Sequence, residues 1–142
     1  MYLLDTNVIS ELRKVKPHGA VLAWFSTVRP YEIAIPAVVI GEIQDGAEIT
    51  RKQDQPKAAE IEAWLDYVLA NFTVLPMDGP MFREWARLMA GKPDDLSGDA
   101  MIAATARVHR LIVATRNVKD FVGLGVEVFN PFADSPGEPL AE

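Results

Sequence analysis

The sequence has no cysteine and only two histidines among its 142 residues. The absence of cysteine excludes disulfide bonds and thiolate metal sites, and it makes the reducing cytoplasm the default expectation. His18 and His109 are too few for a typical histidine-rich zinc site. The sequence also lacks an apolar run long enough to span a bilayer and a basic segment ahead of an apolar one. We therefore expect a cytoplasmic protein with no membrane span and no signal peptide.

Positive charge is also scarce. The sequence has 14 lysines and arginines against 20 aspartates and glutamates, which gives a formal net charge of −6. This balance argues against a broad electrostatic attraction to nucleic acid. It does not exclude a nucleic-acid enzyme whose site charge is offset by a metal. A hydrophobic fraction of 49% and a charged fraction of 24% are ordinary for a single globular domain with a substantial core.

Short apolar runs alternate with stretches of helical periodicity along the chain. We expect strands at residues 2–4, 32–35, 73–75, 111–114 and 126–129. We expect helices at residues 6–12, 17–28, 37–52, 54–72, 80–90 and 97–109, the last of them capped by Asp95 or Ser97. Strands separated by helices predict the α/β class, with a parallel sheet covered on both faces. We expect residues 1–132 to form this domain and residues 133–142 to be a loose tail.

Four acidic residues stand where such a sheet gathers ligands, outside the carboxyl ends of its strands. Asp5 and Asp120 each follow a predicted strand, and Asp99 begins a helix whose amino terminus points to the same edge. Glu42 shares a helix face with apolar residues, including Val39. Carboxylates gathered beside apolar surfaces need a cation to hold them ionised, and a hard divalent metal does this with oxygen ligands.

Each acid also has a purely structural interpretation. Asp5 could cap the first helix, a role that leaves one of its oxygens free for a metal. Glu42 could stand at the edge of the core, and Asp99 could complement a helix dipole. Asp120 lies in a polar stretch that the pattern alone favours as a turn.

Three segments carry these acids. They are MYLLDTNVISEL at residues 1–12, PAVVIGEIQDG at residues 36–46 and GDAMIAATARVHRLIVATRNVKDF at residues 98–121. In their order and spacing, these segments resemble the motifs of PIN-domain ribonucleases of the VapC and FitB toxin type. The resemblance covers residues 1–131, and the sequence keeps an acid at all four acidic positions of the motifs.

The resemblance implies a Rossmann-like PIN domain, in which a central parallel sheet is flanked by helices. It implies the toxin of a type II toxin–antitoxin system, which hydrolyses RNA phosphodiester bonds with Mg²⁺ or Mn²⁺. The catalytic and metal-binding residues would be Asp5, Glu42, Asp99 and Asp120. We expect polar side chains around them to orient the acids or water, and these are Thr6, Asn7, Thr115 and Asn117.

The resemblance further implies a homodimer and a cognate antitoxin that neutralises the toxin and binds DNA through its other end. DNA would then be contacted only through the antitoxin. The apolar helical faces of residues 17–28 and 54–72 favour the same pairing, with Trp64 and Leu65 as candidate interface residues.

Other functions remain as alternatives. A phosphatase of the haloacid dehalogenase type would use Asp5 as its nucleophile, but it would want a second aspartate where this chain has Asn7. A phospho-receiver domain would want a lysine closely following a late strand and would give Glu42 no role. A non-catalytic PIN-like binding module would not need the complete acid set.

Overall fold

The computed structural model describes residues 1–133, so most of the predicted tail, residues 134–142, lies outside the described residues. The five strands are β1 (Tyr2–Leu4), β2 (Ile33–Pro36), β3 (Thr73–Leu75), β4 (Ile112–Ala114) and β5 (Val128–Phe129). The α-helices of the described part are α1 (Thr6–Arg13), α2 (Gly19–Phe25), α3 (Ala37–Arg51), α4 (Gln55–Asn71), α5 (Gly79–Met89) and α6 (Ser97–His109). Short 3₁₀ turns lie at η1 (Pro30–Glu32), η2 (Asp94–Leu96) and η3 (Val118–Phe121).

The strands form one sheet in the order β3-β2-β1-β4-β5, and every pair is parallel. The first strand of the chain lies in the centre, where Leu3 pairs with Ala34 on one side and Val113 on the other. Leu3 and Leu4 are fully buried, as expected for a central strand of a sheet covered on both faces. The predicted α/β class with a central parallel sheet is confirmed.

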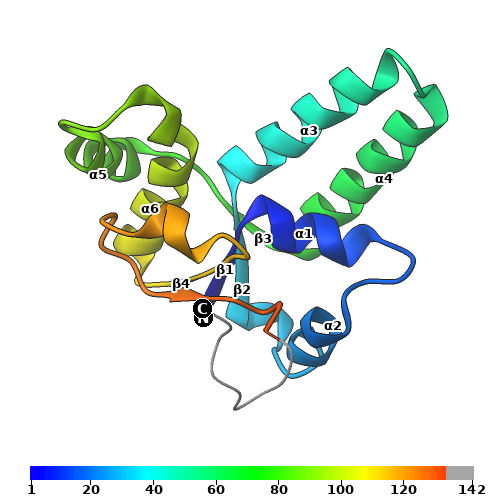
Figure 1. The fold of residues 1–142 in the computed structure, drawn as a ribbon, viewed down its shortest axis with the longest axis horizontal. Coiled ribbons are helices and arrows are strands. Elements are labelled where there is room, and N and C mark those ends of the chain that lie inside the picture. The colour runs from blue at the N-terminus through cyan, green and yellow to red at the C-terminus, as the bar shows by residue number, and fades with distance from the viewer. Residues whose placement is uncertain (134–142) are drawn as a thin grey trace.

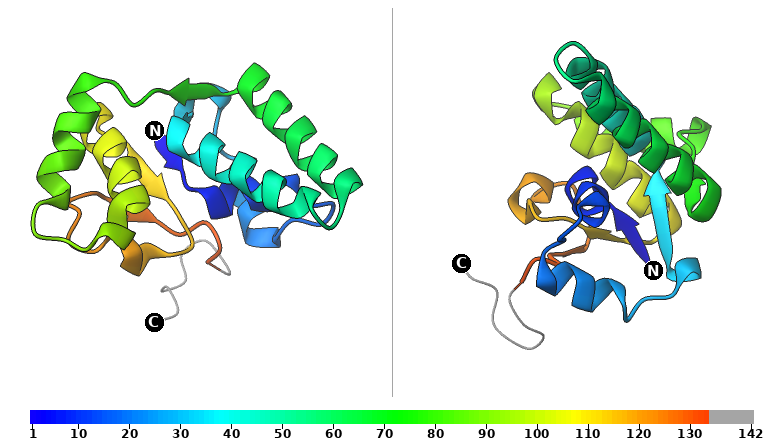
Figure 2. Two further views of the ribbon diagram at one scale, coloured as in Figure 1. Left: turned by 90° about the horizontal axis from the view of Figure 1, so that it is seen from above. Right: turned by 90° about the vertical axis from the view of Figure 1, so that its right-hand side faces the viewer.

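Four of the helices form two packed pairs, α3 with α4 and α5 with α6. In Figures 1 and 2, α3 and α4 extend together on one side, and α5 and α6 lie on the other. The first helix, α1, follows β1 directly and lies below the α3–α4 pair in the view of Figure 1. This arrangement leaves the carboxyl ends of the central strands facing α1, α3 and α6.

The predicted elements are all present, but several ends differ. The helix predicted at residues 17–28 covers only Gly19–Phe25, because His18 caps it by accepting a hydrogen bond from Ala20 N at 3.1 Å. Neither Asp95 nor Ser97 caps α6; instead the η2 turn runs straight into the helix. The last strand is also two residues shorter than predicted.

One side of α4 faces inward, while Tyr67 and Leu69 are exposed. Trp64 packs against the hydrophobic core, and the side chain of Leu65 is only 3% exposed. The expectation that Leu65 faces a partner chain is therefore wrong, because the apolar side of α4 packs on α3 of the same chain. None of the helices within residues 1–133 is long and apolar enough to cross a membrane.

Candidate active site

The carboxyl ends of β1 and β4 lie side by side and bring two distant loops together. Asp5 N donates to Ala114 O at 3.0 Å, which continues the strand pairing by one residue. Beside it, Thr115 Oγ1 donates to Asp5 Oδ2 at 2.8 Å. A carboxylate and a hydroxyl separated by 110 positions in the sequence are thus held in direct contact.

Asp5 is the most buried of the four candidate acids, with 6% of its surface exposed. Its Oδ1 accepts a hydrogen bond from Thr6 N at 2.7 Å, so the predicted role as the cap of α1 is confirmed. Its Oδ2 also accepts a longer bond of 3.3 Å from Asn7 Nδ2. Burial raises the pKa of Asp5, and the hydrogen bonds from Thr115, Thr6 and Asn7 offset only part of that effect.

A small polar network surrounds this carboxylate. Asn7 Nδ2 also donates to Thr115 Oγ1 at 3.3 Å, and Asn7 Oδ1 accepts from Arg116 N at 3.0 Å. Thr115 Oγ1 in turn accepts from Asn117 N at 3.0 Å. Asn117 therefore acts through its backbone, and within residues 1–133 its side-chain amide makes no hydrogen bond. The network fixes the orientation of Asp5 from two loops at once.

Asp99 lies in the first turn of α6 and is half-buried. Its pKa is raised to about 6, first by burial and then by the negative charges of Asp5, Asp120 and Glu42. Charges raise the pKa of a carboxyl group in this way only when they lie close to it, so the other three acids must lie near Asp99. Although they come from four separate segments, they form one electrostatic unit.

Glu42 reaches the same place from α3. Its Oε2 accepts a hydrogen bond of 2.5 Å from Thr6 Oγ1. Its Oε1 lies against Gly98, where a Cβ atom would stand only 3.2 Å away. The glycine that precedes Asp99 therefore leaves room for the Glu42 carboxylate beside the start of α6.

The expectation that Glu42 sits on an apolar face beside the core is wrong. Its side chain is exposed, and Ile49 on the same face is 63% exposed. The buried stripe of α3 instead consists of Val39, Ile43 and Ala47. Because α4 covers that stripe, Glu42 is turned away from it and toward the space in front of α6.

Asp120 belongs to the η3 turn, and its side chain is exposed. The polar turn that the pattern favoured is present, and it also carries the acid toward the cluster. The negative charge of Asp120 contributes to the raised pKa values of both Asp5 and Asp99. No side-chain hydrogen bond in the described part of the chain holds it in place.

The four acids have no ion-paired cation in the part of the chain that the structure describes. Among residues 1–133, none of them forms an ion pair with a lysine, arginine or histidine. The side chains also do not converge closely enough there for any three acids or histidines to hold one metal ion. Asp5 and Glu42 are each held by hydrogen bonds of their own, and mutual repulsion keeps uncompensated carboxylates apart. The donor set itself, carboxylate oxygens without a partner cation, fits a hard divalent ion.

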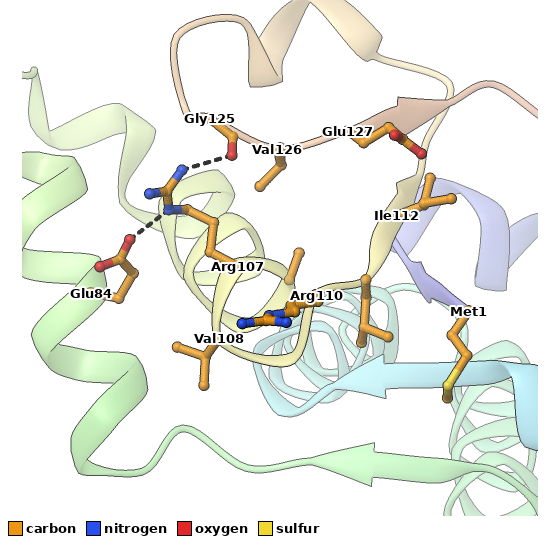
Figure 3. Close-up of a pocket in the computed structure, with 11 residues that line it drawn as sticks. Met1, Glu84, Arg107, Val108, Arg110, Ile112, Gly125, Val126 and Glu127 are labelled. Carbon is orange, nitrogen blue, oxygen red and sulfur yellow. Dashed lines mark hydrogen bonds and ion pairs between the residues drawn. The ribbon is translucent and has the colours of Figure 1, made fainter.

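A separate hollow of about 650 Å³ lies at the opposite edge of the sheet. Figure 3 shows Arg107 beside it, where the guanidinium pairs with Glu84 and donates to Gly125 O at 2.7 Å. Arg110 and Glu127 also line this hollow, and none of the four acids does. The candidate acids thus lie apart from this hollow, at the carboxyl edge of the sheet.

Two contacts at the carboxyl edge were not predicted from the sequence. One is the approach of Glu42 to Gly98, and the other is the bond from Arg116 N to Asn7. The sequence did offer one hint at Gly98. Glycine lowers helix propensity, so its presence in the first turn of a helix indicates that a side chain there would be in the way. The Arg116 contact had none, since it joins segments more than a hundred residues apart.

Comparison with known proteins identifies relatives that match nearly the whole chain. The family described as PIN domain matches residues 2–122. The chain is 33% identical to the Toxin FitB of Neisseria gonorrhoeae, covering 94% of this chain and 100% of that protein. It is 37% identical to the VapC ribonuclease Y4jK of Sinorhizobium fredii, covering 93% and 98% respectively.

Solved structures are also similar. The crystal structure of FitAcB from Neisseria gonorrhoeae matches with a TM-score of 0.80 and 31% identity, covering 93% of this chain and 99% of that one. A toxin–antitoxin complex from Klebsiella pneumoniae matches with a TM-score of 0.64 and 25% identity, covering 92% and 98%.

Proposed function

Because the chain belongs to the PIN-domain family, we propose that it is a metal-dependent endoribonuclease and the toxin of a type II toxin–antitoxin pair. One observation carries this proposal. Acids from four segments lie within electrostatic reach of one another at the carboxyl edge of the sheet, with no ion-paired cation among residues 1–133. Burial, together with the charges of the other three acids, raises the pKa of Asp99 to about 6. A divalent ion is the natural counter-charge for such a site, and relatives of the chain are named as a ribonuclease and a toxin.

Each acid has its own part in this proposal. Asp5 and Asp99 would hold Mg²⁺ or Mn²⁺ directly, and Glu42 and Asp120 would complete the site directly or through water. A bound ion of this kind lowers the pKa of a coordinated water and stabilises charge on the attacked phosphate.

The surrounding polar residues orient the acids. Thr115 and Asn7 hold Asp5 Oδ2, and Thr6 holds Glu42. Asn117 supports Thr115 through its backbone N–H. These contacts pre-arrange two of the carboxylates before any substrate arrives, which reduces the reorganisation that the reaction needs.

The partners follow from the same family. The substrate is RNA, and the cognate antitoxin is the protein partner, as in the toxin–antitoxin complex that the chain resembles. DNA is contacted only through the antitoxin. We also propose that residues 1–132 form the PIN domain and that two copies of the chain associate in the cytoplasm as a homodimer.

Divalent metal is expected to be essential for activity. Purified, antitoxin-free protein should cleave members of a panel of structured RNAs with Mg²⁺ or Mn²⁺, and cleavage should stop in chelator and return when metal is restored. The reason is that carboxylates alone repel both each other and the phosphate. Cleavage is measured by gel electrophoresis of end-labelled RNA, with an Asp99→Asn preparation as the control for contaminating ribonuclease. Equal cleavage in chelator would contradict metal dependence, and a protein that binds RNA but never cuts it would be the binding module.

Thr115→Val is expected to reduce activity while the protein still folds. Valine keeps the shape but removes the hydroxyl that donates to Asp5 and accepts from Asn7 and Asn117. We expect cleavage to fall by about 10–100-fold, the usual effect of losing a group that orients a metal ligand. Stability should fall by about 1–3 kcal/mol, because buried polar groups lose their partner.

The matched control for this prediction is Thr105→Val. Thr105 is also fully buried, but its hydroxyl bonds to Met101 O within α6. Initial cleavage rates and urea unfolding are measured for both variants. A Thr115→Val protein as active as the Thr105→Val protein would show that the hydroxyl does not orient Asp5 for the reaction.

A further inference from the structure

Arg116 stands beside the acid cluster on a fixed piece of backbone. Its N–H donates to Asn7 Oδ1 at 3.0 Å, and the preceding residue, Thr115, donates to Asp5. The Cα atom of Arg116 is therefore anchored by the same network that orients the proposed metal ligand. Its side chain starts one residue away from that contact and is exposed.

The guanidinium group is supported by an aromatic ring. Arg116 Cζ lies 4.3 Å from the centroid of the Phe132 ring, which is a cation–π arrangement. Phe132 is only 8% exposed, and the ring of His18 lies edge-on to it with centroids 5.5 Å apart. The ring is thus a firm platform at the carboxyl ends of β4 and β5. A guanidinium stacked on a ring keeps its in-plane N–H donors free for another partner.

No carboxylate takes up these donors within residues 1–133, because Arg116 forms no ion pair there. The charge of Arg116 helps to lower the pKa of Glu11, but Glu11 already has hydrogen-bond partners. Its Oε1 accepts from Lys14 Nζ at 2.9 Å and its Oε2 accepts from His18 N at 2.8 Å. Arg116 is therefore a positioned cation with open donors in a protein of net charge −6.

From this placement, we propose that Arg116 binds a backbone phosphate of the RNA next to the phosphodiester bond that the acids attack. The inference rests on the proposed ribonuclease function. A planar guanidinium matches the two oxygens of a phosphate with paired, charge-assisted hydrogen bonds. Such a contact attracts the RNA locally, whereas the negative net charge of the protein and the acid cluster repel it. It also fixes the position of the RNA strand relative to the acids.

The chain offers a matched control on the same strand. Arg110 directly precedes Leu111 and β4, and Arg116 follows β4, so the two arginines lie at opposite edges of the sheet. Arg110 is also exposed and without an ion pair in the described part of the chain, but it faces the hollow of Figure 3. Removing either charge changes the net charge equally, and of the two arginines only Arg116 lies on the loop that holds Asp5.

The test is RNA binding as a function of salt. The probe is a fluorescent single-stranded RNA that the wild-type protein cleaves, and anisotropy is measured in chelator across a series of KCl concentrations. Arg116→Gln should weaken binding about tenfold at low salt and reduce the slope of log K against log salt by about 0.7, the value for one phosphate contact on a single strand. Arg116→Lys should keep most of the slope, and Arg110→Gln should match the wild type.

Cleavage kinetics and a packing variant separate phosphate binding from a structural role. With Mg²⁺, Arg116→Gln should raise KM about tenfold and change kcat little, since the contact is made equally before and during the reaction. Arg116→Met keeps an aliphatic stem on Phe132 without the charge, and it should lose the same salt slope as Arg116→Gln.

Two failures are distinguishable. If the wild type cleaves RNA but Arg116→Gln and Arg116→Met keep its salt slope, the inference is wrong, whatever happens to their melting temperatures. If the wild type neither binds nor cleaves any RNA in the panel, the proposed function fails and the inference fails with it.

Discussion

Asp99→Asn should abolish metal-dependent RNA cleavage while the protein keeps its fold. Asp99 is the acid whose pKa responds to all three of the others, Asp5, Asp120 and Glu42, so it occupies the electrostatic centre of the cluster. Loss of a group that merely orients a metal ligand costs about 10–100-fold. Loss of a proposed ligand should cost at least the upper end of that range, about 100-fold or more in kcat/KM.

The same substitution should stabilise the metal-free protein. The pKa of Asp99 is raised from 3.8 to about 6 in the folded state, so folding favours its protonated form. Its contribution to stability is therefore most favourable below about pH 4 and is lost as the pH rises through about 6. At neutral pH the ionised carboxylate is a cost, and asparagine removes it, with a gain on the order of 1 kcal/mol because the half-buried site is partly screened.

Both effects of Asp99→Asn are measured on one preparation. Cleavage is followed with saturating Mn²⁺, and urea unfolding is followed in chelator at about pH 7.5 and pH 5, where the stability gain should shrink at the lower pH. Asp95→Asn is the control, because Asp95 is an exposed acid of the preceding turn. Full activity in a folded Asp99→Asn protein would remove Asp99 from the proposed site.

Asp5→Ala should lose far more activity than Asp120→Ala. Asp5 is buried and its carboxylate is fixed by three hydrogen-bond donors, whereas Asp120 is exposed on a turn. We expect Asp5→Ala to reduce cleavage by about 100-fold or more and Asp120→Ala by about tenfold. Asp5→Ala should also be less stable by about 0.5–2 kcal/mol, since α1 loses its cap.

Asp5→Asn separates the two roles of this residue. Asparagine retains an oxygen that can accept from Thr6 N, so it should recover stability without recovering cleavage. Activities are compared as kcat/KM at saturating Mn²⁺, and stabilities by urea unfolding in chelator. If Asp5→Ala and Asp120→Ala lose activity equally under these conditions, the ranking of the two acids is wrong.

The sequence alone was sufficient for the features that depend on local pattern. The alternation of strands and helices predicted the parallel sheet, and the position of Asp5 after an apolar run predicted the cap of α1. The general rule about the carboxyl edge of such sheets also placed Asp5 and Asp120 at the same edge. These inferences depend only on the local order of residues along the chain and on a general rule for parallel sheets.

The features that failed depend on which helix packs on which. The exposure of Glu42 follows from the way α4 covers Val39, Ile43 and Ala47, which rotates the apolar stripe of α3 relative to the one predicted. Leu65 is buried for the same reason. A single sequence reports that a face is apolar, but it does not report whether the same chain or a second one covers it.

The central position of β1 has a consequence for the making of the protein. The strand leaves the ribosome well before its neighbour β4 and the hydroxyl that holds Asp5, which come 110 residues later. Pairings this distant in sequence form late in folding, after most of the chain is available. The acids of a nascent chain therefore stay apart at least until β4 and the η3 turn have been synthesised. A protein proposed to cut RNA would therefore lack its assembled acid site until those residues have been made.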